Sequence, residues 1–355
     1  MKICIDTQST LGHKTGIGLY TQHLIEAVQA IAPHHHYYSL NWGQTCELRT
    51  DQRLRWQQLV LPKRAKAARA DVLHTPGFDA PRFKPCPTVL TVHDLIGMLF
   101  PENLPPVARF YWSWWLPHSI RWADHIIADS EHTRRDIVRL LGVTRKRITV
   151  IPLGVGPQFH PVSAQQAAQK LRTKHQLPQS YVLYLGTLEP RKGIDTLIES
   201  YALISGEIPQ DLVIAGKRGW FTEPLFELVQ HRRLEDRVHF TGYISDERVP
   251  ALLSAADVFA FPSRYEGFGL PALEAMACGT PVIASNASSL PEVVGDAGLM
   301  VPPDDIPALA QALSEVLGDR DLQRNMRERG LARARCFTWE ETARKTLQVY
   351  EELAG

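Results

Sequence analysis

Two glutamates flank a glycine-containing loop in the segment FPSRYEGFGLPALEAMACG of the second half of the chain. Glu266 stands just before the loop, and Glu274 lies about one turn inside the helix predicted at Leu270–Cys278. Both carboxylates could accept hydrogen bonds from sugar hydroxyl groups in one cleft. Gly267 and Gly269 would let backbone N–H groups approach a ligand closely, and the helix N-terminus favours a phosphate. The segment therefore suits a ligand that carries both kinds of group.

A basic pair, Arg191 and Lys192, follows one predicted strand and precedes a helix. Arginine offers a planar fork to phosphate oxygens and lysine a compact charge, so the pair could hold a diphosphate. His93 ends another apolar run beside Asp94. It is either a site residue or a buried histidine satisfied by its neighbours. Taken alone, each glutamate or basic residue is also typical of a solvated surface.

Short apolar runs alternate with helical patterns, which predicts βαβ units and largely parallel sheets. In the first half we expect strands at Lys2–Asp6, Tyr37–Leu40, Asp71–Thr75, Thr88–Asp94, His125–Ser130 and Ile148–Pro152. A glycine-containing loop at Leu11–Gly18 precedes helices at Leu19–Ile31, Val107–Ala123 and Glu131–Leu141. The second half predicts strands at Tyr181–Thr187, Asp211–Gly216, Val238–Gly242, Asp257–Pro262 and Pro281–Ser285. Its helices are expected at Ile194–Ile204, Glu223–His231, Glu247–Ala255, Leu270–Cys278, Ile306–Leu317, Leu322–Arg335 and Trp339–Leu353.

Three prolines and two glycines interrupt this pattern in IPLGVGPQFHP (151–161), which predicts the start of an interdomain linker. We expect an N-terminal Rossmann-like domain at 1–160 and a second one at 161–335, with a C-terminal helix at 336–355 packing back on the first. The predicted fold class is therefore α/β, with two doubly wound domains facing a cleft. Ligands of such sheets bind at the carboxyl ends of the strands, where the residues above lie.

The composition excludes several classes of protein. The 355 residues carry a formal net charge of +1, so no global field attracts nucleic acid, and no nucleic-acid partner is expected. The five cysteines are scattered and include no C-x-x-C pair, which favours reduced thiols over disulfides or a zinc site. No stretch resembles a signal peptide or a membrane span of about 18 apolar residues. We therefore expect a cytoplasmic protein.

As a set, these motifs resemble glycosyltransferase family 4, a large retaining group with the GT-B fold, and the resemblance extends across nearly the whole chain. The glutamate segment is similar to the family's E-x7-E motif, and YLGTLEPRKGID (184–195) to the opening of its second domain. Gly16-Ile17-Gly18 resembles its N-terminal glycine loop, and TVHDL (91–95) one of its strand ends. LPEV (290–293) resembles a further signature on the donor side.

The resemblance implies a role for each matched residue in binding a nucleotide-sugar donor. Arg191 and Lys192 would bind the diphosphate, Glu266 would contact the transferred sugar, and Glu274 would hold the ribose hydroxyls. The histidine would face the donor sugar, and the first glycine loop would lie against the diphosphate. The residues expected to be catalytic are His93, Arg191, Lys192 and Glu266. Those expected to bind the donor are Gly16, Gly18, Tyr243, Gly267, Phe268, Gly269, Leu270 and Glu274.

No cofactor and no metal ion are expected. The only D-x-D motif, Asp319-Arg320-Asp321, connects two predicted helices and follows no strand. Magnesium normally sits on carboxylates beside substrate phosphates. The basic pair, the glycine loop and the helix N-terminus could stabilise the leaving diphosphate instead. The triplet His34-His35-His36 lacks supporting ligands and is interpreted as a loop.

The resemblance implies retention by same-face attack, with the leaving phosphate helping to deprotonate the acceptor. Glu266→Ala and Lys192→Ala are expected to lower turnover by orders of magnitude and to leave the fold intact. Taken together, the motifs look most like the family's mannosyltransferases, which favours GDP-mannose, and UDP-sugars are the alternative donors. A sugar-nucleotide epimerase with the same fold and a non-catalytic binding module are the rival functions. An epimerase would need no acceptor, and a binding module would not need all of these residues.

The acceptor is expected to be a glycan or a lipid-linked saccharide. Residues 53–69 contain six basic residues and no acidic one, and residues 108–122 contain four tryptophans and two other aromatic residues. Basic and aromatic side chains together suit an anionic membrane surface, so peripheral membrane contact is one interpretation. The alternative is a solvated basic face beside a helix packed by aromatic core residues.

Overall fold

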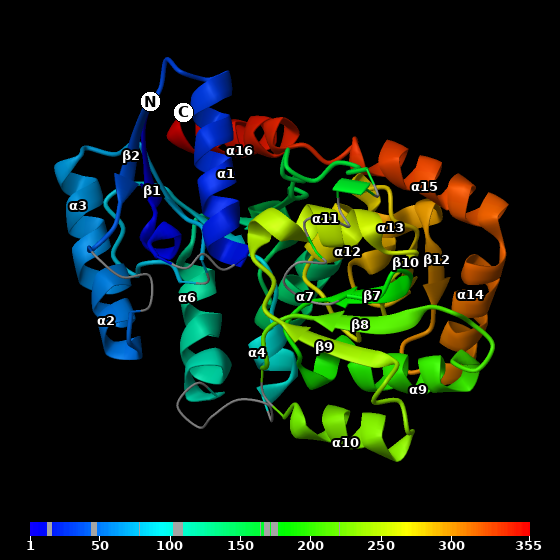
Figure 1. Ribbon diagram of the computed structural model, residues 1–355. Helices are drawn as coiled ribbons and strands as arrows, with labels where there is room; N and C mark the ends of the chain where they lie inside the picture. Colours follow the sequence, from blue (N-terminus) through cyan, green and yellow to red (C-terminus); the bar gives the residue numbers. More distant parts are fainter. Residues whose placement is uncertain are drawn as a thin grey trace. The chain divides into compact units, whose positions relative to one another are not determined.

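The computed structural model describes residues 1–12, 16–43, 48–77, 79–101, 109–163, 165–166, 171, 177–219 and 221–355. The chain divides into two compact units. The first comprises residues 1–154 and 337–355, and the second comprises residues 155–336. Each contains a six-stranded sheet of its own and is described by itself (Figure 1). The start of the helix predicted at Val107–Ala123 and the centre of the loop predicted at Leu11–Gly18 lie outside the described residues.

The sheet of the first unit is parallel throughout, in the order β2-β1-β3-β4-β5-β6. Its strands are β1 (Lys2–Asp6), β2 (His36–Leu40), β3 (Val72–Thr75), β4 (Thr88–Val92), β5 (His125–Ala128) and β6 (Ile148–Val150). Every residue of β3 and β4 is buried, as expected for central strands covered on both faces. Val92 pairs with Ala128 at the carboxyl ends of β4 and β5, so the residues that follow them are neighbours.

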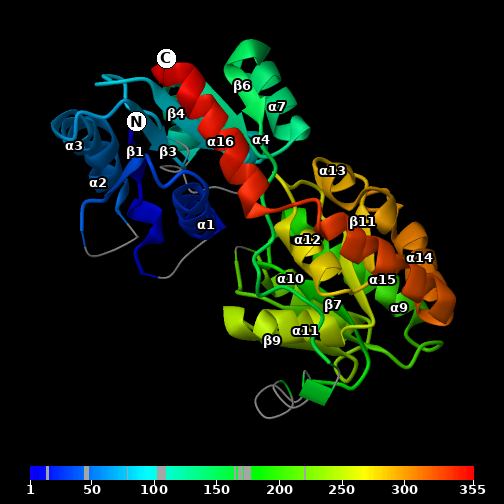
Figure 2. The same cartoon turned by 90° about the horizontal axis from the view of Figure 1, so that it is seen from above.

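The last helix of the chain belongs to the first unit. The helical segments of that unit are α1 (Gly16–Ile31), α2 (Thr50–Arg55), η2 (Trp56–Val60), α3 (Leu61–Ala67), α4 (Ile96–Leu99), η4 (Tyr111–Trp115), α6 (Leu116–Trp122), α7 (Glu131–Leu141) and α16 (Trp339–Ala354). Helix α16 lies beside α1, as Figure 2 shows, and the ring of Trp339 stacks on His23 with their centroids 5.0 Å apart. The hydroxyl of Tyr350 is 2.5 Å from Nδ1 of His74 in β3.

The sheet of the second unit is also parallel, in the order β12-β11-β10-β7-β8-β9. Its strands are β7 (Tyr181–Leu185), β8 (Asp211–Ala215), β9 (Val238–Gly242), β10 (Val258–Phe261), β11 (Val282–Ser285) and β12 (Leu299–Val301). Its α-helices are α9 (Ile194–Ile204), α10 (Glu223–His231), α11 (Val249–Ala255), α12 (Leu270–Ala277), α13 (Leu290–Val294), α14 (Ile306–Gly318) and α15 (Arg320–Ala334). The chain winds outward from β7 in one direction and from β10 in the other, so the topological switch point lies between these two strands. Such a switch point is where doubly wound sheets bind ligands.

The predicted α/β fold class, with two doubly wound parallel sheets, is confirmed. Several predicted bounds were wrong. Helix α1 begins at Gly16 and not at Leu19, so Gly16–Gly18 forms its first turn and not a loop. Strand β4 ends at Val92, two residues earlier than predicted, because its neighbour β5 pairs with it no further. The helices between residues 50 and 67 and the short elements α13 and β12 were not predicted.

Candidate functional site

A buried ion pair stands at the switch point of the second unit. Lys192 closes a short 3-10 turn (Pro190–Lys192) after β7, and Glu266 lies in the loop after β10. The Nζ atom of Lys192 donates to Oε1 of Glu266 at 2.6 Å, and the two side chains are 9% and 10% exposed. Burial lowers the pKa of Lys192 although Glu266 opposes the change. Burial alone would raise the pKa of Glu266, but Lys192 and Arg191 outweigh it and hold that pKa below its usual range.

Arg191 lies beside this pair and is held by other groups. Its Nη1 atom donates to the carbonyl oxygen of Tyr265 at 3.0 Å and lies 3.5 Å from Oε1 of Glu266. Its Nε atom is 3.0 Å from a carboxylate oxygen of Glu189. One oxygen of Glu266 therefore faces both cations. A phosphate oxygen at that position would meet the same two charges, which favour oxyanions.

The loop that contains Glu266 is hydrogen-bonded to the residues at the start of α13. The hydroxyl of Ser289 donates to the carbonyl oxygens of Glu266 at 2.9 Å and of Phe268 at 2.7 Å. The hydroxyl of Ser288 accepts from the N–H of Glu266 at 2.8 Å. The LPEV motif thus has a local role, because it opens the helix that anchors the glutamate loop. Gly267 continues this loop.

Two glycines allow close backbone approaches here. Gly269 has φ of +112° before α12, and a Cβ there would lie 2.7 Å from Cδ2 of Leu290. Gly193 has φ of +67° after the turn that carries Lys192, and a Cβ there would collide with the carbonyl oxygen of Pro262. Both conformations disfavour other residues. Phe268 is buried, and Leu270 is the first residue of α12.

Glu274 differs from Glu266 in having no cation beside it. It is half-buried on α12, and among the described residues none donates a hydrogen bond to its carboxyl group. Burial, with a smaller contribution from Asp246, raises its pKa to about 8. A carboxyl group in this state has hydrogen-bonding capacity to offer a ligand. Tyr243 follows β9, is 46% exposed and lies under Lys217, whose Nζ atom is 4.9 Å from the ring centroid.

His93 belongs to the first unit, just beyond the end of β4. Its Nδ1 atom lies 2.6 Å from Oδ2 of Asp129, and its Nε2 atom lies 2.9 Å from the carbonyl oxygen of Pro76. Both partners accept hydrogen bonds, so this arrangement favours the doubly protonated ring. Burial would lower the pKa of His93, but the Asp129 carboxylate outweighs it and the net pKa is raised. The edge of the Tyr20 ring also packs on the imidazole.

The two glycines of the N-terminal motif lie in the first turn of α1. Gly16 is exposed, and an added Cβ there would meet nothing within 4 Å, whereas Gly18 is buried. Backbone N–H groups of a first helical turn have no partners inside the helix. Anions bind to such turns in other proteins, and the role of Gly16 and Gly18 toward a diphosphate stays a prediction.

Sequence reasoning missed the residues that hold the predicted ones in place, namely Asp129, Glu189, Ser288 and Ser289. Strand order could have found Asp129, because it follows β5 as His93 follows its neighbour β4. The serines precede a motif that was recognised, but the sequence does not say which loop their hydroxyl groups reach.

The D-x-D motif has a structural explanation. A side-chain oxygen of Asp319 accepts hydrogen bonds from the N–H groups of Asp321 and Leu322, so it caps helix α15. Within the described part of the chain, no group of three or more His, Cys, Asp or Glu side chains is arranged to hold a metal ion. In the same residues, no helix is long and apolar enough to cross a membrane.

Comparison with known proteins adds to this geometry. The family description "Glycosyltransferase Family 4" matches residues 22–159, and "Glycosyl transferases group 1" matches residues 166–333. O-antigen chain mannosyltransferase B from Escherichia coli is 38% identical over 303 residues, which cover 83% of this chain and 79% of that protein. The chain belongs to glycosyltransferase family 4. It is accordingly a glycosyltransferase.

Other relatives and solved structures are also similar to this chain. Serotype-specific mannosyltransferase WbdA from Escherichia coli is 32% identical over 277 residues, 76% of this chain, and the match spans only 34% of that longer protein. Sucrose-phosphate synthase from Thermosynechococcus elongatus superposes with a TM-score of 0.77 at 26% identity, covering 99% of this chain and 98% of that chain. WaaG, a glycosyltransferase involved in lipopolysaccharide biosynthesis, has a TM-score of 0.73 at 17% identity, covering 99% of both chains, and shares the fold. The fold is GT-B.

Proposed function

We propose that the protein transfers a mannosyl group from GDP-mannose, with retention, to a glycan or lipid-linked saccharide acceptor. The observation that carries the proposal is the 38% identity to an O-antigen chain mannosyltransferase over most of both chains. A second relative, MMP alpha-(1->4)-mannosyltransferase from Mycolicibacterium hassiacum, is 31% identical over 284 residues. The names of these relatives also suggest that the product is a polysaccharide such as an O-antigen.

In this proposal the donor diphosphate lies against Arg191 and Lys192. The bond between the sugar C1 and the phosphate oxygen breaks, its electron pair leaves with the diphosphate, and the two cations stabilise the resulting charge. The acceptor oxygen forms the new bond to C1 from the same face and gives its proton to the leaving phosphate. Because Lys192 pairs with Glu266, the diphosphate must compete with that carboxylate for the cation.

The two glutamates have different tasks in this scheme. Glu266 keeps its charge through Lys192 and would accept hydrogen bonds from hydroxyl groups of the transferred sugar. Glu274 would hold the ribose hydroxyls, and its carboxyl group has no competing donor among the described residues. His93 would lie at the donor sugar as a cation. Since both ring nitrogens have partners in the first unit, one of them must be exchanged for the sugar contact.

The reaction is further proposed to need no metal ion or other cofactor, because Arg191 and Lys192 supply positive charge where a metal ion would otherwise lie. Activity with GDP-mannose should then persist in excess EDTA. A loss that magnesium or manganese restores would contradict this part of the proposal alone.

The donor is tested directly with the purified protein. Thermal unfolding is measured with GDP-mannose, UDP-glucose, UDP-N-acetylglucosamine and ADP-glucose, because only a bound ligand raises the midpoint by mass action. We expect GDP-mannose to give the largest increase and to support mannose transfer to oligosaccharide acceptors. A larger increase with a UDP-sugar would replace the donor. Conversion of the nucleotide-sugar to its epimer without any acceptor would instead favour an epimerase.

The first unit also carries a candidate membrane face, defined here by Phe110, Trp114 and the basic residues at 53–69. Phe110 and Trp114 are 62% and 52% exposed, and their rings stack with centroids 5.5 Å apart. Trp115 of η4 and Leu54 of α2 instead pack on the core of this unit. We include in the proposal that this face contacts anionic lipid where a lipid-linked acceptor resides.

A further inference from the structure

A cavity of about 600 Å³ opens at the amino end of the second sheet. Its walls include residues that immediately precede or begin strands, among them Tyr181, Asp257 and Pro281. The residues discussed above follow the carboxyl ends of the same strands. The cavity lies at the amino ends of the strands and the Lys192–Glu266 pair at their carboxyl ends. A strand of four or five residues spans roughly 13–17 Å, so the two places are separated by about that distance. The cavity is therefore distinct from the candidate donor site.

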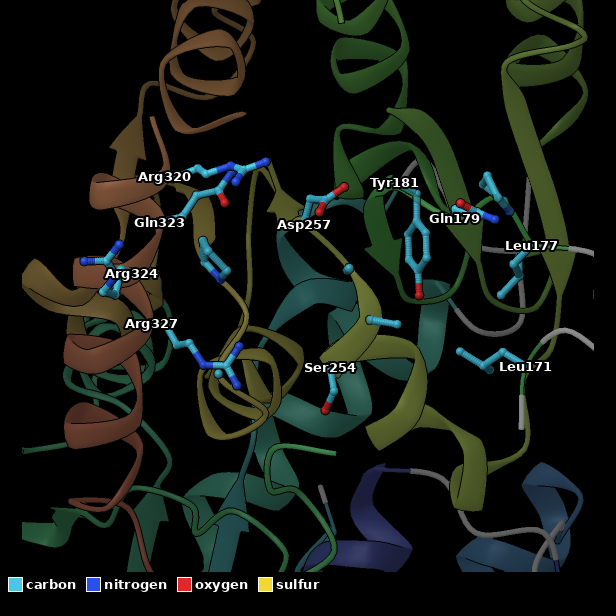
Figure 3. A pocket seen from close by; sticks show the side chains of 15 residues that line it. Leu171, Leu177, Gln179, Tyr181, Ser254, Asp257, Arg320, Gln323, Arg324 and Arg327 are labelled. Atoms are coloured by element: carbon cyan, nitrogen blue, oxygen red, sulfur yellow. The ribbon is translucent and has the colours of Figure 1, made fainter. Parts of the chain in front are cut away.

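One wall of the cavity is cationic. Arg320, Arg324 and Arg327 recur at helical spacing along α15 and lie along the same wall, as Figure 3 shows. Arg324 pairs with Asp321 at 3.1 Å, but both side chains are largely exposed, so the pair contributes little. In the part of the chain that the structure describes, no carboxylate pairs with Arg320 or Arg327. Like charges at this spacing repel each other, and an anion bound between them would relieve the repulsion.

The position of Arg327 depends on a glycine. Gly279 follows α12 with φ of +74°, and a Cβ there would lie 3.1 Å from Nε and 3.2 Å from Cζ of Arg327. The guanidinium therefore lies against the backbone of Gly279 at the cavity wall. A Cβ at residue 279 would require the guanidinium to move by a few tenths of an ångström.

The opposite wall offers an acceptor and apolar surface. Oδ2 of Asp257 is buried and has no hydrogen-bond partner among the described residues. Because Asp257 lines the cavity, the accessible part of its carboxyl group can accept a hydrogen bond from a ligand hydroxyl group there. Leu171 and Leu177 stand on the same side as Tyr181 and could cover the carbon skeleton of a small ring (Figure 3).

We propose that this cavity is a second binding site, for a small phosphorylated sugar whose phosphate meets the arginines of α15 and whose hydroxyl group donates to Asp257. A bidentate guanidinium–phosphate contact suits the first requirement, and a carboxylate acceptor suits the second. The volume lies within the usual range for small-molecule sites. Because the amino and carboxyl ends of the strands are separate, the sugar phosphate and the nucleotide-sugar bind at the same time.

The test is titration calorimetry with mannose 6-phosphate, inorganic phosphate and mannose as probes of the full-length protein. We expect saturable binding of mannose 6-phosphate, weaker binding of phosphate and none of mannose. The double variant Arg324→Ala/Arg327→Ala should weaken mannose 6-phosphate at least ~tenfold, as for loss of charge-assisted hydrogen bonds. Arg329→Ala, which removes a charge from the same helix outside the cavity, should leave the affinity unchanged.

Two further measurements locate the ligand. Asp257→Ala should weaken mannose 6-phosphate and not phosphate, since it removes only the hydroxyl acceptor and one negative charge. The amide resonance of Gly279 should shift on titration in the unmodified protein. The proposal is overturned if mannose 6-phosphate does not bind saturably, or if Arg329→Ala weakens it as much as the double variant. It is also overturned if binding survives the double variant but is lost in Lys192→Met, which would place the ligand at the donor site.

Discussion

Lys192 and Glu266 form a buried ion pair, with Nζ of the lysine 2.6 Å from Oε1 of the glutamate. The same oxygen lies 3.5 Å from Nη1 of Arg191. The glutamate therefore occupies the position at which two cations could hold a phosphate oxygen. Lysine and glutamate are usually solvated surface residues. Lys192 and Glu266 are both buried instead.

This pair makes Lys192→Met and Glu266→Gln informative variants. Each should lower turnover by orders of magnitude, because in the proposed function one removes a cation from the diphosphate and the other a carboxylate from the sugar. Each should also destabilise the fold by about 3–5 kcal/mol, since removal of one partner leaves the other charge buried. A loss of this size lowers the stability without abolishing a fold of typical stability, so the intact fold expected for the alanine variants stays a prediction. Urea unfolding and initial transfer rates measure the two effects separately.

The double variant Lys192→Met/Glu266→Gln provides the control. It removes both charges, so it should recover much of the lost stability and none of the activity. Near-normal turnover in either single variant would contradict the site assignment. A double variant no more stable than the singles would contradict the buried pair.

Asp129→Asn tests how His93 is held. Asp129 raises the pKa of His93, so the variant should lower that pKa in an NMR titration of the ring. Because the folded-state pKa lies above 6.5, the stability from this interaction is complete below pH 6.5 and is lost as pH rises through the folded value. The variant should therefore be less stable than the parent at low pH, and the difference should shrink above pH 6.5.

His125 serves as an internal reference for this experiment. It lies at the other end of β5, and burial lowers its pKa. Its titration should not change in Asp129→Asn. An unchanged pKa of His93 in the variant would show that the carboxylate does not act on the ring as described.

Whether a strand or helix was predicted depended on how clearly its residue pattern marks it in the sequence. Apolar runs identified the strands because residues on both faces of a parallel sheet are buried. Helix α7 was predicted at its observed bounds because Ser130 caps its start and Gly142 its end. The helical segment at 50–67 was not predicted. Its buried apolar residues, Trp56, Leu61 and Ala65, are few and lie among many basic residues.

The candidate site residues were selected from the sequence by type, but their partners were not predicted. Arg191 and Glu266 are 75 residues apart in the chain, and only the pairing of β7 with β10 brings their loops together. The pairing of β4 with β5 does the same for His93 and Asp129. Motifs thus indicate candidate ligand-binding side chains, whereas strand order decides which other side chains contact them.

The variant Glu274→Gln should change the pH dependence of folding stability and, separately, the affinity for the donor. Burial raises the pKa of Glu274 from 4.5 to about 8, so the folded state opposes its ionisation. The parent protein therefore loses stability as pH rises from 4.5 through 8, and the loss is complete above that range. The glutamine variant lacks this loss and should melt at a higher temperature than the parent at pH 9, with the gap closing towards pH 4.5. If Glu274 holds the ribose, the same variant should bind the donor more weakly. Equal melting temperatures at pH 9 would contradict the raised pKa.

Gly193→Ala tests the close approach beside Lys192. A Cβ at residue 193 would collide with the carbonyl oxygen of Pro262, and φ is +67°. Gly142 is the matched control, because its φ is +64° but an added Cβ would meet nothing within 4 Å. Gly142→Ala should cost only the left-handed strain of about 1 kcal/mol. Gly193→Ala should cost more and should lower turnover by displacing Lys192. Equal losses in urea unfolding would show that the contact with Pro262 relaxes easily.

The membrane face is tested by cosedimentation with vesicles of 30% anionic phospholipid at low salt. Lys63→Glu/Lys66→Glu should reduce binding steeply, because each basic residue near such a surface contributes about 1 kcal/mol, roughly fivefold in partition. Phe110→Ser/Trp114→Ser should reduce it by removing apolar contact. Leu203→Ser, at an equally exposed apolar position of the second unit, should change nothing. Binding that is absent in the parent protein, or that survives both double variants, would remove lipid contact from the proposal. Mannose transfer to a water-soluble acceptor should be unaffected in either case, because these side chains lie outside the donor-binding set.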